Sequence, residues 1–346
     1  MVRAGRGSYS FGDEGGGPAA AVAEQPQALS ADKKRPVLVT GASGLVGIHT
    51  CRELTKNGRQ VRALIRDPAK AALSLGQLPV EFRVGDVRDA STLRSSLNGC
   101  GAVVHLAAIA IEKKTEKYAE TNTAATERLI SAARAENVQR VIFMSQNGAD
   151  SRSPHAFLHS KGVAQDSIRT SGLQWTVLRP SVIFGPEDQF VNVLGRLIRL
   201  TPKFFPLPGG GKACFQPIAV DDVARVIRLS LEKKETVRQS YDLGGPAQLS
   251  LRDMTERILV AMGTTRTLVS VPIKALRPIV SLTSRFLPNP PVTTGLLDLL
   301  SVDNTVSNNA LKEVFRVSPT PFAGDELGYL RRITFRSALR SLFERQ

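Results

Sequence analysis

The chain of 346 residues is 42% hydrophobic and 22% charged, with a net charge of +15. This composition is typical of a globular protein, and no apolar run approaches the roughly 18–20 residues of a membrane-spanning helix. The positive charge by itself identifies no partner, because nucleic acid, anionic lipid and acidic ligands would all be attracted. Only 5% of the residues are aromatic. Since aromatic rings are the usual platform for single-stranded nucleic acid, we do not expect a nucleic-acid partner.

The N-terminus and the cysteines bear on location. Residues 1–34 are rich in glycine and alanine without hydrophobic periodicity, so we expect a disordered tail. The tail lacks the apolar core of a secretory signal, and its acidic residues argue against a mitochondrial presequence, but a chloroplast transit peptide stays open. Cys51, Cys100 and Cys214 have no metal-like or disulfide-like spacing. We therefore expect no metal and a reducing compartment, which is the cytoplasm unless an organelle is targeted.

The apolar run at residues 37–40 leads into a glycine-rich turn. Gly41, Gly44 and Gly47 have a Gly-x-x-Gly-x-x-Gly spacing, and residues 48–57 are expected to form a helix. Gly41 permits the chain to reverse, Gly44 leaves room for a pyrophosphate, and Gly47 permits close packing of helix and strand. The helix N-terminus would face the phosphates, so the pattern predicts a dinucleotide site. The other residues of the expected phosphate loop are Ser43, Leu45 and Val46. The alternative is a turn with no ligand.

Beyond this turn, apolar strands alternate with amphipathic helices. Further strands are expected at residues 60–65, 80–84, 102–106, 141–144 and 175–178. Such alternation predicts an α/β fold with a doubly wound parallel sheet. We expect this dinucleotide-binding domain at residues 35–232. A small C-terminal lobe, residues 233–346, is expected to complete the substrate pocket and to end in a basic amphipathic segment.

The ends of the second and third strands are expected to contact the adenosine half of the cofactor. An acid at the end of the second strand accepts hydrogen bonds from the ribose, whereas an arginine pairs with a 2′-phosphate. Because Arg66 precedes Asp67 there, we expect NADP(H) to bind in preference to NAD(H). Otherwise Arg66 is an ordinary surface charge. Asp86 is expected to accept the adenine amino group, with Val87 packed on the ring.

The end of the fourth strand provides small residues. Ala107 and Ala108 would let the backbone lie against the second phosphate and its ribose. The helix expected at residues 121–135 carries Asn122 and Thr126 one turn apart, where they could serve the cofactor side. A solvated helical face explains Thr126 equally well.

Three motifs carry a resemblance to a known superfamily. They are TGASGLVG at residues 40–47, LRPSVIFGP at 178–186 and FQPIAVDDVA at 215–224. From about residue 36 to 232, the chain resembles an atypical, extended short-chain dehydrogenase/reductase with a Rossmann fold. It is most similar to a branch that holds the nucleotide-binding accessory subunit of respiratory complex I and proteins implicated in ubiquinone biosynthesis. The resemblance implies a dinucleotide across the strand ends, Pro180 and Val182 among its contacts, and a quinone-like molecule as a second ligand.

The resemblance also implies an active site of a serine or threonine with Tyr-x-x-x-Lys. Ser145 and Lys161 match, and Lys161 would anchor the nicotinamide ribose, but Phe157 replaces the expected tyrosine. The tyrosine of the superfamily exchanges a proton with the substrate, and losing a placed acid costs on the order of 10²–10⁴ in rate. One hypothesis is therefore a dinucleotide-binding protein with little or no reductase turnover, in a structural, sensing or quinone-linked role. The other is an NADPH-dependent reductase or isomerase with a different proton donor.

Three residues are candidates for that donor. His155 and His159 flank position 157, but neither projects from a helix where residue 157 does. Tyr118 lies in the loop after the fourth strand and could reach inward. A third hypothesis, an RNA-binding relative of the kind found in plastids, is disfavoured by the few aromatic residues.

The C-terminal third is expected to contain a flexible loop and basic helices. The loop, residues 202–211, would cover a ligand, and Asp221 and Asp222 would open a helix, where the helix dipole explains them. Residues 272–287 and 331–345 mix Leu, Ile and Phe with Lys and Arg at helical spacing. For residues 331–345, one explanation is a packed surface helix. The other is a basic amphipathic helix in weak contact with an anionic membrane.

Overall fold

The structure is a computed structural model that describes residues 34–112, 115–287, 290, 292–300 and 302–343. The tail expected at residues 1–34 lies outside the described residues, apart from Lys34. Within the described part of the chain, no helix is long and apolar enough to cross a membrane.

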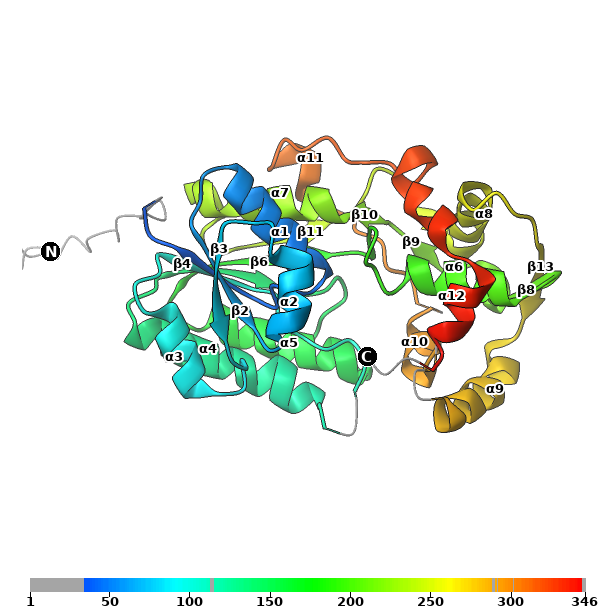
Figure 1. The fold of residues 1–346 in the computed structure, drawn as a ribbon, viewed down its shortest axis with the longest axis horizontal. Coiled ribbons are helices and arrows are strands. Elements are labelled where there is room, and N and C mark those ends of the chain that lie inside the picture. Colours follow the sequence, from blue (N-terminus) through cyan, green and yellow to red (C-terminus); the bar gives the residue numbers. More distant parts are fainter. Residues whose placement is uncertain (1–33, 113–114, 288–289, 291, 301, 344–346) are drawn as a thin grey trace, which may run out of the picture.

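A seven-stranded sheet forms the centre of the molecule, in the order β11-β6-β5-β4-β1-β2-β3 (Figure 1). Its strands are β1 (Val37–Thr40), β2 (Val61–Ile65), β3 (Val80–Val84), β4 (Ala102–His105), β5 (Arg140–Met144), β6 (Gln174–Pro180) and β11 (Gln239–Leu243). All neighbouring pairs are parallel. The first strand, β1, lies inside the sheet; the chain then winds out to the edge strand β3, crosses back to β4 and continues to the other edge at β11. This is the doubly wound sheet that the alternating pattern predicts.

Helices cover both faces of the sheet, because alternate side chains of each strand point to opposite faces. The helices are α1 (Leu45–Lys56), α2 (Pro68–Leu75), α3 (Ala90–Leu97), α4 (Ala125–Ala135), α5 (Ala156–Arg169), α7 (Val220–Glu232) and α11 (Ala310–Glu313). Val37 and Val39 of β1 pack with α1, α2, α7 and α11, whereas Leu38 packs with α3, α4 and α5. Figure 1 shows α1 and α7 on one side of the sheet and α3, α4 and α5 on the other. The helix expected at residues 121–135 is preceded by a π-helical turn, Ala119–Ala124.

The remaining elements gather at one end of the sheet around a separate core (Figure 1). They are β7 (Ile183–Phe184), α6 (Val191–Leu200), β8 (Phe204–Pro208), β9 (Cys214–Phe215), β10 (Ile218–Ala219), β12 (Leu249–Ser250), α8 (Leu251–Ala261), β13 (Thr267–Val271), α9 (Ile273–Phe286), α10 (Thr294–Leu299), the 3₁₀ helix Gly324–Arg332 and α12 (Phe335–Arg340). The lobe contains α6, which precedes residue 232, and the sheet contains β11, which follows it. The chain therefore enters the lobe before residue 232 and returns to the sheet after it, so a single boundary at residue 232 does not separate the two parts.

The prediction of a flexible loop at residues 202–211 is wrong for most of that segment. Its residues form β8, which pairs in parallel with β13. Phe205 and Leu207 are buried in the lobe core, so apolar burial fixes a segment that its prolines and glycines predict to be mobile. The glycines follow as a short 3₁₀ turn, Gly209–Gly211.

The helix expected at residues 331–345 is divided in the structure. Leu330 and Ile333 are buried in the lobe, and a new helix, α12, starts after Thr334. Thr334 Oγ1 accepts the N–H of Ser337 at 3.1 Å, while Ser337 Oγ accepts the N–H of Thr334 at 2.9 Å. This capping box starts α12 as a separate helix after the 3₁₀ helix Gly324–Arg332. The large apolar side chains left exposed are Phe335, Leu339 and Phe343.

The two acids that open α7 have partners beyond the helix dipole. Asp221 Oδ1 lies 2.6 Å from Nδ1 of His49, on α1. Asp222 Oδ2 accepts the N–H of Thr320 at 2.7 Å. The start of α7 therefore joins the first helix of the sheet domain to the C-terminal segment.

Candidate functional site

The turn between β1 and α1 is packed so tightly that two of its glycines are required. Gly41 has a φ of +67°, and a Cβ there would lie 2.8 Å from the backbone nitrogen of Ala107. A Cβ at Gly47 would lie 2.2 Å from the carbonyl oxygen of Gly41. Packing of the turn explains both glycines without any ligand.

Gly44 is different, because it is exposed at the N-cap of α1. A Cβ there would meet only the carbonyl oxygen of Gly41, at 3.3 Å. The absence of a side chain at Gly44 therefore leaves an accessible surface at the helix start, with Ser43 half-buried beside it. The N–H groups of Leu45 and Val46 have no acceptor in their own helix, and the helix dipole adds positive potential. Such a surface fits a phosphate.

At the end of β2, the two charged residues have separate roles. Arg66 is exposed, and its Nη1 forms an ion pair with Oε1 of Glu116, from the loop after β4. Asp67 caps α2: its Oδ1 accepts the N–H groups of Ala69 and Lys70 at 2.9 and 3.1 Å. Because Asp67 is bound to the helix that it starts, Arg66 is the ionic group that this strand end presents.

At the end of β3, Asp86 is held by Arg88. Oδ1 accepts the backbone N–H of Arg88 at 2.8 Å, and Oδ2 accepts from Nη2 at 2.7 Å. The side-chain hydrogen bonds from Arg88 lower the pKa of Asp86, so its carboxylate is charged at neutral pH. Val87 is buried in the core beneath β1 and β4. The contacts of Asp86 and Val87 with an adenine ring stay predictions.

A buried polar chain connects β1, β4 and α4. The Oγ1 of Thr126 donates to the carbonyl of Asn122 at 2.7 Å and lies 3.1 Å from Nε2 of His105. His105 Nε2 therefore carries the proton and donates to Thr126, which leaves Nδ1 to accept from Thr40 Oγ1 at 2.7 Å. Burial, with a smaller effect of the Lys161 charge, lowers the pKa of His105 to about 3, so the ring is neutral.

Sequence analysis missed His105, although a polar residue ends each of the adjacent strands β1 and β4. It also left a solvated face open for Thr126, and this alternative is wrong because Thr126 is buried. Asn122 is buried as well. Its Oδ1 accepts the N–H of Ile109 at 2.9 Å, and its Nδ2 donates to Ser160 Oγ at 3.0 Å. Asn122 thus fixes the backbone that follows Ala107 and Ala108 against α5.

The structure brings Ser145 and Lys161 to the end of β5. Lys161 is buried; its Nζ donates to the carbonyl of Met144 at 2.6 Å and lies 4.7 Å from the centroid of the Phe143 ring. Burial lowers the pKa of Lys161 to about 7. Ser145 is also buried, and its Oγ has no hydrogen-bond partner among the described residues. An unpartnered buried hydroxyl, one residue beyond the carbonyl that Lys161 binds, is suited to a polar ligand atom.

Phe157 stands on the first turn of α5, half-buried against Tyr118. The two ring centroids are 5.9 Å apart. The Tyr118 hydroxyl donates to a backbone carbonyl at 2.8 Å, and burial together with a nearby carboxylate raises its pKa. His155 is the N-cap of α5, and His159 is exposed. Tyr118 is thus the candidate donor whose ring contacts position 157.

Pro180 and Val182 lie where the sheet joins the lobe. The carbonyl of Pro180 accepts the N–H of Asn147 at 3.0 Å, and that of Val182 accepts the N–H of Ile218 at 2.9 Å. The Val182 side chain packs against the lobe core. Contact of Pro180 and Val182 with a cofactor stays a prediction.

A C-terminal segment that sequence analysis missed crosses the same edge. Asn147 Nδ2 donates to Asn304 Oδ1 at 2.8 Å, and the Ser181 hydroxyl donates to the Asn304 carbonyl. Asn309 Nδ2 donates to the carbonyl of Gly244 at 2.7 Å, just after β11. These amides carry no periodic signal, because their partners are distant in sequence.

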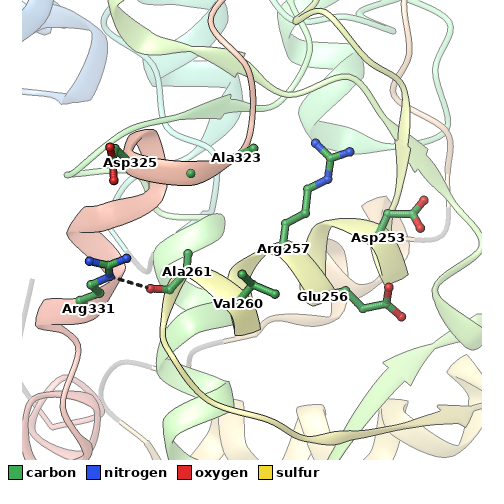
Figure 2. Close-up of a pocket in the computed structure, with 9 residues that line it drawn as sticks. Asp253, Glu256, Arg257, Val260, Ala261, Ala323, Asp325 and Arg331 are labelled. Carbon is green, nitrogen blue, oxygen red and sulfur yellow. Dashed lines mark hydrogen bonds between the residues drawn. The ribbon is translucent and has the colours of Figure 1, made fainter.

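A surface groove of about 370 Å³ lies elsewhere, between α8 and the 3₁₀ helix Gly324–Arg332 (Figure 2). Its lining mixes charges, and its arginines bind the protein itself. Arg331 Nε donates to the carbonyl of Ala261 at 3.2 Å, and Arg257 Nη1 donates to that of Phe322 at 3.1 Å. The groove shares no lining residue with the carboxyl edge of the sheet, and we assign it no role.

The buried ammonium of Lys161 makes stability depend on pH. The unfolded chain keeps this proton up to about pH 10.5 and the folded chain up to about pH 7, so the free energy of unfolding should rise with pH between these values. Lys161→Met should remove this part of the slope, whereas Lys312→Met, at an exposed lysine, should keep it. Denaturant unfolding across the window measures both. Equal slopes in the parent and Lys161→Met would show that Lys161 is not the titrating group.

Comparison with known proteins identifies a dinucleotide-binding family. A family described as NAD(P)H-binding matches residues 41–234. The chain is 28% identical over 291 residues to NADH dehydrogenase (ubiquinone) 1 alpha subcomplex subunit 9, mitochondrial, of Arabidopsis thaliana, a match that covers 79% of this chain and 71% of that protein. It is 27% identical over 227 residues to the NAD(P)H azoreductase of Xenophilus azovorans, covering 66% and 74% of the two chains.

The fold is also shared with a solved structure. A nucleoside-diphosphate-sugar epimerase from Staphylococcus aureus superposes with a TM-score of 0.66 at 18% identity, over 86% of this chain and 100% of that one. The family match, the parallel sheet and the glycine turn lead to one conclusion: the chain belongs to the NAD(P)H-binding family, as an atypical member of the short-chain dehydrogenase/reductase superfamily.

Proposed function

We propose that this protein binds a nicotinamide dinucleotide along the carboxyl edge of the sheet and has little or no reductase turnover. The exposed Gly44 at a helix N-terminus and the unpartnered Ser145 hydroxyl support the binding half. When bound, the nicotinamide would supply or accept hydride. The chain would supply the phosphate contacts of α1 and the Lys161 ammonium beside the nicotinamide ribose.

Phe157 is the observation that supports low turnover. A phenyl ring cannot donate the proton that a carbonyl oxygen needs as hydride arrives. Lys161 is present four residues after Phe157, as the Tyr-x-x-x-Lys motif requires. Its Nζ, however, donates to a backbone carbonyl and not to the hydroxyl of a catalytic tyrosine. The site therefore holds groups that orient a cofactor without the group that completes reduction.

The second candidate is an NADPH-dependent reductase or isomerase with another proton donor. The contact of Tyr118 with Phe157 favours it, as does similarity to a protein named as an azoreductase. The Tyr118 phenol is protonated at neutral pH, as a general acid requires, but the raised pKa makes it a weaker acid than a free tyrosine. Its hydroxyl is engaged by a backbone carbonyl, however, and it would have to exchange that bond for the substrate.

A role near quinone or respiratory metabolism is part of the proposal. It is supported by the plant relative, whose name makes it a subunit of an NADH–ubiquinone enzyme. A quinone-like molecule is the proposed second ligand. The proposed location is the cytoplasm or an organelle, and a peripheral membrane contact would be compatible with either.

Phe157→Tyr tests the proposed loss of chemistry. We expect the parent to bind NADPH and to reduce quinones and simple carbonyls no faster than background. A phenol restored beside Lys161 should raise turnover by about tenfold or more with little change in cofactor affinity. Nicotinamide fluorescence measures binding and absorbance of NADPH measures turnover, with Phe157→Leu as the control for loss of the ring. A parent that is already active and is inactivated by Tyr118→Phe would establish the second candidate instead.

NADP(H) is the proposed cofactor in preference to NAD(H), because Arg66 is the ionic group at the end of β2. Arg66→Asp should erase or reverse the preference, since a carboxylate repels a 2′-phosphate and accepts hydrogen bonds from ribose hydroxyls. The dissociation constants of NADPH and NADH measure the effect. Arg94→Asp, the same charge change at an exposed arginine on α3, should leave their ratio unchanged. An unchanged ratio in Arg66→Asp would make Arg66 a surface charge only.

A weak contact with anionic membrane is proposed for the C-terminal segment. Residues 331–343 contain arginines and no acid, and Phe335, Leu339 and Phe343 are exposed among them. We expect the protein to float with anionic liposomes at low ionic strength and to dissociate as salt is added. Replacing Phe335 and Phe343 by serine should abolish flotation without unfolding the lobe. Absence of flotation at low salt would leave this segment with a packing role alone.

A further inference from the structure

Glu116 contacts a residue that is distant in sequence and central to the proposed cofactor preference. It lies in the loop between β4 and the π-helical turn, and its carboxylate pairs with Arg66 at the end of β2. The Glu116 side chain is 15% exposed, whereas that of Arg66 is 59% exposed. A carboxylate that is largely removed from water requires a cationic or hydrogen-bonding partner, and Arg66 provides it.

The pair belongs to a larger group of charges at the ends of β2 and β3. Arg66 acts on Asp86, where its positive charge adds to the lowering of the Asp86 pKa by Arg88. Glu116 acts on Arg88, where it adds to the raising of the Arg88 pKa by Asp86. Two arginines and two carboxylates therefore interact across this corner, and their formal charges cancel. A third carboxylate nearby, Glu120, also adds to the raising of the Arg88 pKa.

We propose that Glu116 is a specificity-determining residue that opposes NADP(H) at this corner. The inference rests on the proposed function, in which the adenosine half of a dinucleotide lies over these strand ends. A 2′-phosphate bound to Arg66 would share the guanidinium with the Glu116 carboxylate, which already pairs with Nη1, and would lie next to that carboxylate. A 2′-hydroxyl carries no charge, so NAD(H) leaves the ion pair in place. Arg66 favours NADP(H), and Glu116 limits the size of that preference.

The physical reason is competition between two anions for one guanidinium. A charge-assisted contact with arginine is strong for either a carboxylate or a phosphate, so Arg66 attracts a phosphate less while Glu116 neutralises part of its charge. A phosphate that took the Nη1 position would also leave the largely buried Glu116 carboxylate without its partner. Repulsion of the wrong ligand is a common source of specificity in addition to attraction of the right one.

Glu116→Gln tests this role directly. The amide is nearly isosteric but uncharged, so Arg66 becomes available and the repulsion disappears. We expect NADPH to bind about tenfold more tightly, because the variant removes one moderate unfavourable ionic effect of Glu116 on the 2′-phosphate. The dissociation constant of NADH should change little. Nicotinamide fluorescence gives both dissociation constants. Calorimetry with 2′,5′-ADP and 5′-AMP isolates the adenosine half, where the same ratio change should appear.

Two further variants give the controls. Glu112→Gln removes the same charge from the same loop, but Glu112 pairs with Lys117 at 3.8 Å, so the NADPH/NADH ratio should not change. In an Arg66→Ala background, Glu116→Gln should have a smaller effect on NADPH, because the competition for Arg66 is absent and only the repulsion between the carboxylate and the 2′-phosphate is relieved.

The outcomes separate this inference from the proposed function. If both cofactors bind and Glu116→Gln leaves their ratio at the parental value, the specificity role is overturned and dinucleotide binding stands. An equal gain for NADH and NADPH would also overturn it, since the effect would then be on loop position. If neither cofactor nor either adenosine fragment binds the parent or the variants, the proposed function fails, and this inference fails with it.

Discussion

The close packing of the β1–α1 turn is the constraint on which the rest of this structure depends. The turn passes between the start of α1 and the end of β4, where backbone atoms leave no space for a Cβ at Gly41 or Gly47. Because β1 is an interior strand paired with β2 and β4, the same turn sets how α1 lies on the sheet and where the ends of β2 and β4 stand relative to it. The helix N-terminus consequently opens at the carboxyl edge, with Gly44 uncovered.

Along that edge, polar groups are divided between those that build the site and those that a ligand would use. His105, Thr126 and Asn122 satisfy one another or the neighbouring backbone, and burial keeps the imidazole neutral. Ser145 differs, since its hydroxyl has no partner in the described part of the chain. Lys161 lies between these cases: it contacts a carbonyl and an aromatic ring, yet burial still lowers its pKa to about 7. In the proposed function, these groups would bind and orient the cofactor, and Phe157 stands where a proton donor would be expected.

The lobe is attached to this edge by polar contacts as well as by apolar ones. Asn304 receives hydrogen bonds from Asn147 and Ser181, each close to the end of a sheet strand. Within the lobe, the buried Asp188, which precedes α6, accepts a hydrogen bond from Tyr329 at 3.0 Å. Since buried hydrogen bonds are costly to break, the contacts of Asn304 hold the lobe above the strand ends.

Sequence alone determined the parallel sheet, because burial on both faces imposes apolar strands and the helices between them have their own period. It also located the glycine turn, Ser145, Lys161 and the replacement at Phe157, since each depends on residue type at a fixed spacing. What it could not give were relations between distant segments. The strand formed by β8 depends on its pairing with β13, the burial of Thr126 depends on His105, and the partner of Arg66 is a glutamate fifty residues later. Local propensity contains none of these contacts, so the tertiary structure decided them.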